Sequence, residues 1–183
     1  AELNPSEPDY GILLAQAQKE AGDLEAAAAT YRTLLDRQPN SLKALQGLAT
    51  LLVEQQRPQA AGGLVQESLD QAIAANKSKP NSADVVSIRL LLGEVYVKLE
   101  RYDDAIAAFD KALEGNPKDF RPVLAKAIVL RNQGKTQQAE ELFATAAGLA
   151  PDRFKDQIRK LAATEPGAEP TPAVSPSPSP AQP

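Results

Sequence analysis

The clearest indication of the fold runs from Leu92 to Pro117 and reads LGEVYVKLERYDDAIAAFDKALEGNP. Leu92 and Tyr96 are four residues apart, so they lie on one face of a helix. Gly93, beside Leu92, has no side chain and permits a neighbouring helix to come close. The first part of the stretch therefore predicts a helix that packs tightly against another element.

The second part of the stretch predicts a helix folded back on the first. Ala105, Phe109 and Ala112 follow at helical spacing. The small Ala105 permits a tight crossing, Phe109 fills the space between this hairpin and the next, and Pro117 stops the helix. Because one hairpin cannot bury both of its apolar faces, it needs copies of itself on either side.

Copies of this hairpin recur along the chain. Aligning Ala27 with Ala105 in the sequence also aligns Tyr31 with Phe109. A proline then follows Tyr31 and Phe109 at the same distance. The equivalent alanines of the four copies, spaced by 34, 44 and 34 residues, are Ala27, Ala61, Ala105 and Ala139. The longer interval marks an insertion of ten residues. We expect it to add about one turn to each adjoining helix around a polar loop, Asn76 to Ser82.

The order and spacing of these residues resemble the tetratricopeptide repeat family, whose unit is a helix pair of 34 residues. The resemblance implies an all-α, right-handed superhelical solenoid of four helix-turn-helix repeats plus a C-terminal capping helix. The expected organisation is a flexible lead at residues 1–8, the solenoid at 9–164 and a disordered Pro/Ser-rich tail at 165–183. Within the solenoid we expect repeats at about 9–41, 42–82 with the insertion, 83–119 and 120–151, followed by the capping helix at 152–164.

Composition argues against several classes of function. The 183 residues contain no Cys and no His, which removes disulfides, the commonest metal ligand and every His-dependent triad. We therefore expect no metal, no cofactor and no enzymatic activity. The net charge of -4 without a long run of either sign argues against nucleic acid as a partner. No apolar run approaches the roughly 20 residues that span a bilayer. We therefore expect a soluble domain, cytoplasmic or membrane-associated, whose membrane contact would require an N-terminal anchor before Ala1.

The resemblance also implies a concave groove, lined by the first helix of each repeat, that holds a peptide or helix of another protein. The positions that face this groove in the family are, in this chain, Ile12, Gln16, Lys19, Lys43, Gln46, Thr50, Leu90, Glu94, Val97, Leu124, Ile128 and Arg131. A subgroup that grips a C-terminal carboxylate needs Lys and Asn in the first repeat and Lys and Arg in the third. Those positions hold Ile12 and Gln16, then Ser87 and Leu91, so we expect no carboxylate clamp.

Each feature of the predicted groove has two interpretations. Leu90, Leu124 and Ile128 either line it as an apolar strip or belong to the core. The charged residues beside the strip either select the charge of a partner or are ordinary solvated surface, and they are Lys43, Glu94 and Arg131.

The function that we predict is a non-enzymatic scaffold for protein binding, of the kind represented by assembly factors and co-chaperones. The Ala- and Gln-rich repeats and the Pro-Ser-Ala tail look like tetratricopeptide proteins of cyanobacteria and plastids, which would place the chain near thylakoid membranes. Two alternatives stay open: a structural module that associates with its own copies, and a regulatory subunit or appended domain of an enzyme on another chain. We expect a monomer.

Overall fold

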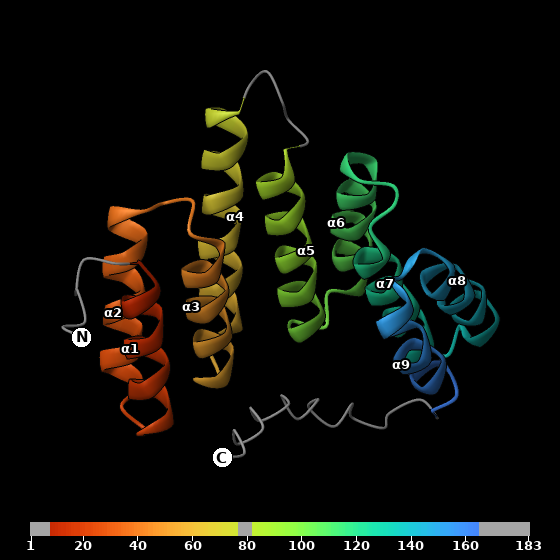
Figure 1. The fold of residues 1–183 in the computed structure, drawn as a ribbon, viewed down its shortest axis with the longest axis horizontal. Coiled ribbons are helices and arrows are strands. Elements are labelled where there is room, and N and C mark those ends of the chain that lie inside the picture. The colour runs from red at the N-terminus through yellow and green to blue at the C-terminus, as the bar shows by residue number, and fades with distance from the viewer. Residues whose placement is uncertain (1–7, 77–81, 165–183) are drawn as a thin grey trace, which may run out of the picture.

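The computed structural model describes residues 8–76 and 82–164, and the helices in those ranges form a single series of antiparallel pairs (Figure 1). In chain order they are α1 (Pro8–Glu20), α2 (Leu24–Arg37), α3 (Leu42–Glu54), α4 (Pro58–Ala75), α5 (Ala83–Lys98), α6 (Tyr102–Gly115), α7 (Phe120–Asn132), α8 (Thr136–Leu149) and α9 (Asp152–Ala162). The described residues include no strand. The hairpins follow one another across Figure 1, and α8 is turned relative to α1 and α2. This arrangement confirms the all-α superhelical solenoid of four hairpins and a ninth helix.

Two predicted segments lie outside the described residues. These are the tail at 165–183 and the flexible lead, of which only Pro8 is described, as the first residue of α1. Helix α9 ends at Ala162, two residues before the predicted end of the capping helix.

The turn inside each hairpin has the same local geometry in all four repeats. The first helix ends with a residue in the left-handed conformation, and these residues are Gly22, Gln56, Glu100 and Gly134. The next backbone N–H donates to the carbonyl five residues earlier, as from Asp23 to Gln18 at 2.9 Å and from Arg101 to Tyr96 at 2.9 Å. This Schellman motif satisfies carbonyls at the end of each first helix and reverses the chain.

The inserted residues lengthen two helices, as predicted. Helix α4 has 18 residues and α5 has 16, whereas the other helices of the four hairpins have 13 or 14. Pro58 occupies the first turn of α4, where its missing N–H costs no hydrogen bond. Residues 77–81 of the expected loop lie outside the described ranges.

Close packing inside the third hairpin depends on Gly93. The side chain of Phe109 is completely buried between α5, α6 and α7, in a cluster with Leu90 and Val129. A Cβ atom added at Gly93 would lie 2.3 Å from Cε1 of Phe109. The ring therefore packs on the bare backbone of Gly93 in the same hairpin, and its cluster with Val129 of α7 fills the space towards the next hairpin.

Gly93→Ala is expected to destabilise the protein by about 1–3 kcal/mol, because the added methyl overpacks a site whose ring has no room to move. The matched control is Gly63→Ala in α4, where an added Cβ meets nothing within 4 Å. There the higher helix propensity of Ala should stabilise by roughly 0.5–1 kcal/mol. Urea unfolding of both variants measures the difference, and equal effects at the two sites would contradict this account of Gly93.

The C-terminal end of the solenoid is closed by α9. Ile158 is buried at 2% exposure, and Phe154 and Leu161 pack beside it on the cluster formed by α7 and α8. The rings of Phe154 and Phe120 lie 5.5 Å apart between centroids. The opposite face of α9 is charged and exposed, which is what the last element of a repeat array requires.

Candidate partner-binding groove

Three neighbouring hollows lie along the first helices of the four hairpins. The first, of about 310 Å³, lies between α1 and α3 and includes Ile12, Gln16, Lys19, Lys43, Gln46 and Thr50. The second, of about 290 Å³, lies between α3 and α5 and includes Thr50, Val53, Glu54, Leu91, Glu94 and Lys98. The third, of about 400 Å³, is formed by α3, α5 and α7 and includes Gln46, Ser87, Leu90, Leu91, Glu94, Arg121, Leu124 and Ile128.

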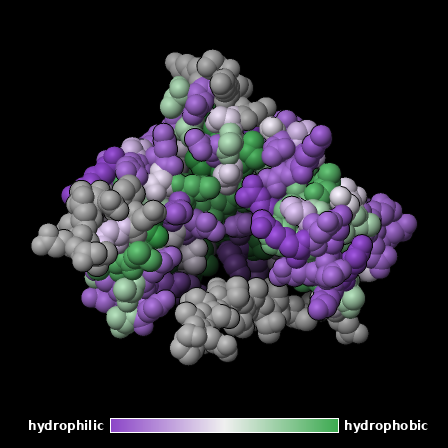
Figure 2. All heavy atoms as spheres, in the orientation of Figure 1, coloured by the Kyte–Doolittle hydropathy of each residue, from purple (hydrophilic) through white to green (hydrophobic). Residues whose placement is uncertain are grey.

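Shared residues join the hollows into one groove. Thr50 belongs to the first and second hollows, Gln46 to the first and third, and Leu91 and Glu94 to the second and third. Figure 2 looks onto a hollowed centre of the molecule, where hydrophobic and hydrophilic side chains lie next to each other. The groove therefore runs across all four first helices and combines apolar and charged groups.

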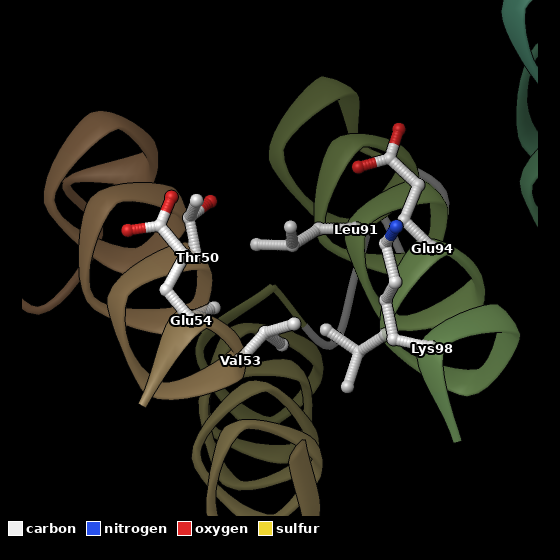
Figure 3. A pocket seen from close by; sticks show the side chains of 8 residues that line it. Thr50, Val53, Glu54, Leu91, Glu94 and Lys98 are labelled. Atoms are coloured by element: carbon white, nitrogen blue, oxygen red, sulfur yellow. The ribbon is translucent and has the colours of Figure 1, made fainter. Parts of the chain in front are cut away.

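In the second hollow, α3 and α5 each contribute both apolar and charged side chains. In Figure 3, α3 contributes Thr50, Val53 and Glu54 to one wall. From the other wall Leu91 extends towards α3, with Glu94 and Lys98 beside it on α5. The apolar side chains lie between the helices and the charged ones at the rim. A ligand here would bury apolar groups between two rows of charge.

The electrostatics of the groove centre on Glu94. Burial raises the pKa of the Glu94 carboxyl, and the nearby Arg121 guanidinium opposes this shift. Glu94 still has solvent contact, so its environment is a partly dehydrated rim.

Arg121 is held in place by Asp119 at the start of α7. The Arg121 guanidinium donates to Asp119, with Nη2 2.6 Å from Oδ2, and the Arg121 backbone N–H donates to Oδ1 of the same residue at 3.0 Å. Burial alone would raise the pKa of Asp119, but the side-chain and backbone hydrogen bonds from Arg121 outweigh it, and the net pKa is lowered. Asp119 is thus the ionised N-cap of α7 and fixes a half-exposed cation at the rim of the groove.

Ten of the twelve residues predicted from the sequence line these hollows, and two do not. Val97 packs on the cluster around Phe109. Arg131 is buried at 5% exposure, and its Nη1 donates to the Leu161 carbonyl at 2.5 Å and to the Thr164 hydroxyl at 3.1 Å. The predicted role of Arg131 in selecting a partner's charge is therefore not available to it, because its guanidinium is used to hold α9.

The apolar strip divides between the two interpretations. Leu90 lines the third hollow but is only 8% exposed and belongs to the buried cluster with Phe109, so the core interpretation applies to it. Leu124 and Ile128 are half-buried: they pack on the cluster under α9 and still face the hollow. The exposed apolar surface of the groove is thus smaller than the sequence predicted.

Several groove residues were missed by the sequence reasoning. On α5 these include Lys98, while Ser87 and Leu91 were considered only as positions of a carboxylate clamp. With Glu94 these residues form a stripe at intervals of four, three and four residues. Residues at that spacing lie on one face of a helix. A register shifted by one position from Leu90 would therefore have predicted these residues as the groove face of α5. Arg121 could have been found from the Asp-x-Arg pattern at the start of α7.

The described residues offer neither a metal site nor a membrane-spanning helix. No group of His, Cys, Asp and Glu that could hold a metal ion occurs in residues 8–76 and 82–164. Among the helices described above, none is both long and apolar enough to span a membrane.

A solenoid of helical hairpins with a groove along its first helices defines a class of repeat proteins that act as interaction modules. Three models described as tetratricopeptide repeat match this chain, at residues 12–41, 40–118 and 90–154, so that together they account for residues 12–154. The chain belongs to the tetratricopeptide repeat family.

Solved structures share the fold. A thermophilic tetratricopeptide protein of Thermus thermophilus, TTC0263, is similar with a TM-score of 0.62 and 24% identity, over 86% of this chain and 81% of that one. YrrB, described as a tetratricopeptide protein with an unusual peptide-binding site, is similar with a TM-score of 0.52 and 21% identity, over 87% of this chain and 76% of that one.

The curated relatives are longer proteins. The SLOW GREEN 1 protein of Arabidopsis thaliana, described as chloroplastic, is 26% identical over 94 residues, which are 51% of this chain and 30% of the relative. The chain spans less than a third of the length of the curated relatives that it matches.

Proposed function

We propose that this chain is a non-enzymatic scaffold that binds a peptide or helical segment of another protein along the concave groove. The observation that carries the proposal is the continuity of the three hollows, which share Gln46, Thr50, Leu91 and Glu94 and extend over four helices. A single small molecule would fill one hollow, whereas a polypeptide follows several in sequence. The peptide-binding site named for YrrB supports the same kind of ligand.

The groove favours an amphipathic partner. Leu91, Leu124 and Ile128 offer half-buried or buried apolar contacts, and a partner's aliphatic side chains would add to them. Rim charges of both signs, Glu94 and Arg121 among them, would set the register and orientation of the segment rather than supply most of the affinity.

A role in assembly at a plastid membrane is a finer part of this proposal. Its support is the match to a chloroplastic relative over about half of the chain. Cell fractionation with an antibody to the solenoid tests it: recovery with the thylakoid fraction is expected, and recovery only in the cytosol would end this part of the proposal.

The groove is tested by blocking it with Gln46→Lys and Thr50→Lys together. Both positions are exposed and lie where hollows join, so two long side chains should obstruct the path of a ligand without unfolding the protein. The partner is captured from native extract by affinity and quantified by mass spectrometry. The amount of specific partner recovered should fall at least about tenfold, which corresponds to roughly 1.4 kcal/mol of binding free energy.

The control carries the same charge change on α8, as Gln137→Lys with Gln138→Lys, at exposed positions outside the three hollows. Partner capture should be unchanged in this control, and both variants should keep the wild-type melting temperature. Undiminished capture by the folded groove variant would show that the partner binds elsewhere.

A further inference from the structure

The N-terminal end of the solenoid presents an apolar stripe on α1, formed by Tyr10, Leu13, Leu14 and Ala17. Leu13 is 62% exposed and Leu14 39%, and the third exposed large hydrophobic side chain of the described residues, Leu149, lies on α8. Figure 2 shows hydrophobic side chains at the surface over this N-terminal hairpin, at the left of the view.

The residues of this stripe can be compared with the residues at the equivalent positions of the later repeats. The residues equivalent to Leu14 in α3 and α5 are Leu48 and Leu92, which are 2% and 4% exposed. The residues equivalent to Ala17 are also buried in the later hairpins, and they are Leu51, Val95 and Val129. The stripe on α1 therefore occupies positions that the later hairpins bury. The Leu14 position is apolar in α3 and α5, whereas in α7 it holds Lys126, which pairs with Asp110 of the hairpin before.

Contacts at the equivalent positions confirm that they face the preceding hairpin. A Cβ added at Gly47, which is equivalent to Leu13, would lie 2.4 Å from the Tyr31 ring of the hairpin before. Val129 lies in the same cluster as Phe109, again from the hairpin before. The surface of α1 thus has the composition of a hairpin interface, and no described helix precedes it.

We propose that a second copy of this chain covers the stripe, through a two-fold contact in which two α1 helices pack antiparallel. The stripe is self-complementary, because its large residues Leu13 and Leu14 precede the small Ala17 by one helical turn. In an antiparallel pair Leu13 of each copy then lies opposite Ala17 of the other, Leu14 flanks that contact, and a two-fold axis makes it twice.

The charges at the other end of the solenoid disfavour a head-to-tail contact of α1 on α9. The outer face of α9 carries Arg153, Asp156 and Lys160, all exposed. Packing the apolar stripe of α1 on that face would remove these charges from water, and although Asp156 already pairs with Arg159, the stripe would offer no further polar partner. The two-fold contact avoids this cost and closes after two copies. It goes beyond the proposed function, because it uses a face of α1 next to the one on which Gln16 and Lys19 line the groove.

Sedimentation equilibrium across a concentration series tests the proposal on the full chain. We expect the weight-average mass to rise from the monomer value of 19.5 kDa to twice that value. Leu14→Glu should keep the mass at that of the monomer, because it places a carboxylate in the contact. The matched control, Leu149→Glu, changes a leucine of similar exposure, 37% against 39%, and should still form the dimer.

Cysteine cross-linking tests the antiparallel geometry, since the chain contains no cysteine of its own. Mixing Leu13→Cys chains with Ala17→Cys chains should give a mixed disulfide dimer at least tenfold faster than either variant alone. The proposal would be overturned by a monomer at all concentrations or by a dimer that survives Leu14→Glu. It would also be overturned if either cysteine variant alone cross-linked as fast as the mixture. Circular dichroism of every variant confirms that the fold is retained.

Discussion

A chain ending at Pro151 is expected to aggregate and to lose its cooperative thermal transition, whereas a chain ending at Thr164 keeps both solubility and transition. Each large side chain is worth roughly 1.5–3 kcal/mol when fully buried. Ile158 is buried, and Phe154 and Leu161 are partly buried on the same cluster. Their loss is a large fraction of the roughly 5–15 kcal/mol that keeps a domain folded.

Removing α9 also deprives Arg131 of its acceptors. This buried guanidinium donates to the Leu161 carbonyl and to Thr164, so the shorter chain would leave a cation among apolar residues without those hydrogen bonds. Calorimetry and light scattering on the two truncated chains measure the effect of α9 alone, since both lack residues 165–183. A soluble chain ending at Pro151 that melts like the longer one would contradict this role.

Leu90→Asp is expected to destabilise the protein by at least about 4 kcal/mol. The substitution removes a side chain that is 8% exposed and places a short carboxylate next to the completely buried Phe109. Large-to-small core substitutions alone cost about 2–5 kcal/mol, and the unpaired charge adds to that. Because Asp is too short to reach far into the groove, solvent gives it little relief.

The matched control for Leu90→Asp is Thr50→Asp, which adds a carboxylate on the same concave side at an exposed position. We expect its effect to lie within about 0.5 kcal/mol of zero. Urea unfolding compares the two variants. A Leu90→Asp protein as stable as the control would mean that Leu90 is free to move into the groove and is available to a partner.

Local spacing was sufficient to predict most of the fold. Ala105, Phe109 and their equivalents recur at a fixed interval, and that interval specifies helix pairs because a helix places residues three and four apart on one face. The longer interval between Ala61 and Ala105 located the insertion, and α4 and α5, which adjoin it, are the two lengthened helices. The apolar face of Phe154, Ile158 and Leu161 likewise predicted α9.

The groove was predicted less well because its exposure depends on neighbouring helices. Leu90 and Leu91 both line the third hollow, yet they are only 8% and 7% exposed, because neighbouring helices cover most of each side chain. Arg131 is an ordinary surface cation in the sequence, and only the position of α9 makes it a buried donor.

The helices, their pairing and their order could be predicted from the sequence, since these depend on residues close together in the chain. Which side chains remain accessible is a property of the folded array, since it depends on whether another hairpin lies beside them. Leu14 and Leu48 occupy the same register, yet one is 39% exposed and the other 2%. The physical reason is that α3 packs on the hairpin before it, whereas no described helix precedes α1.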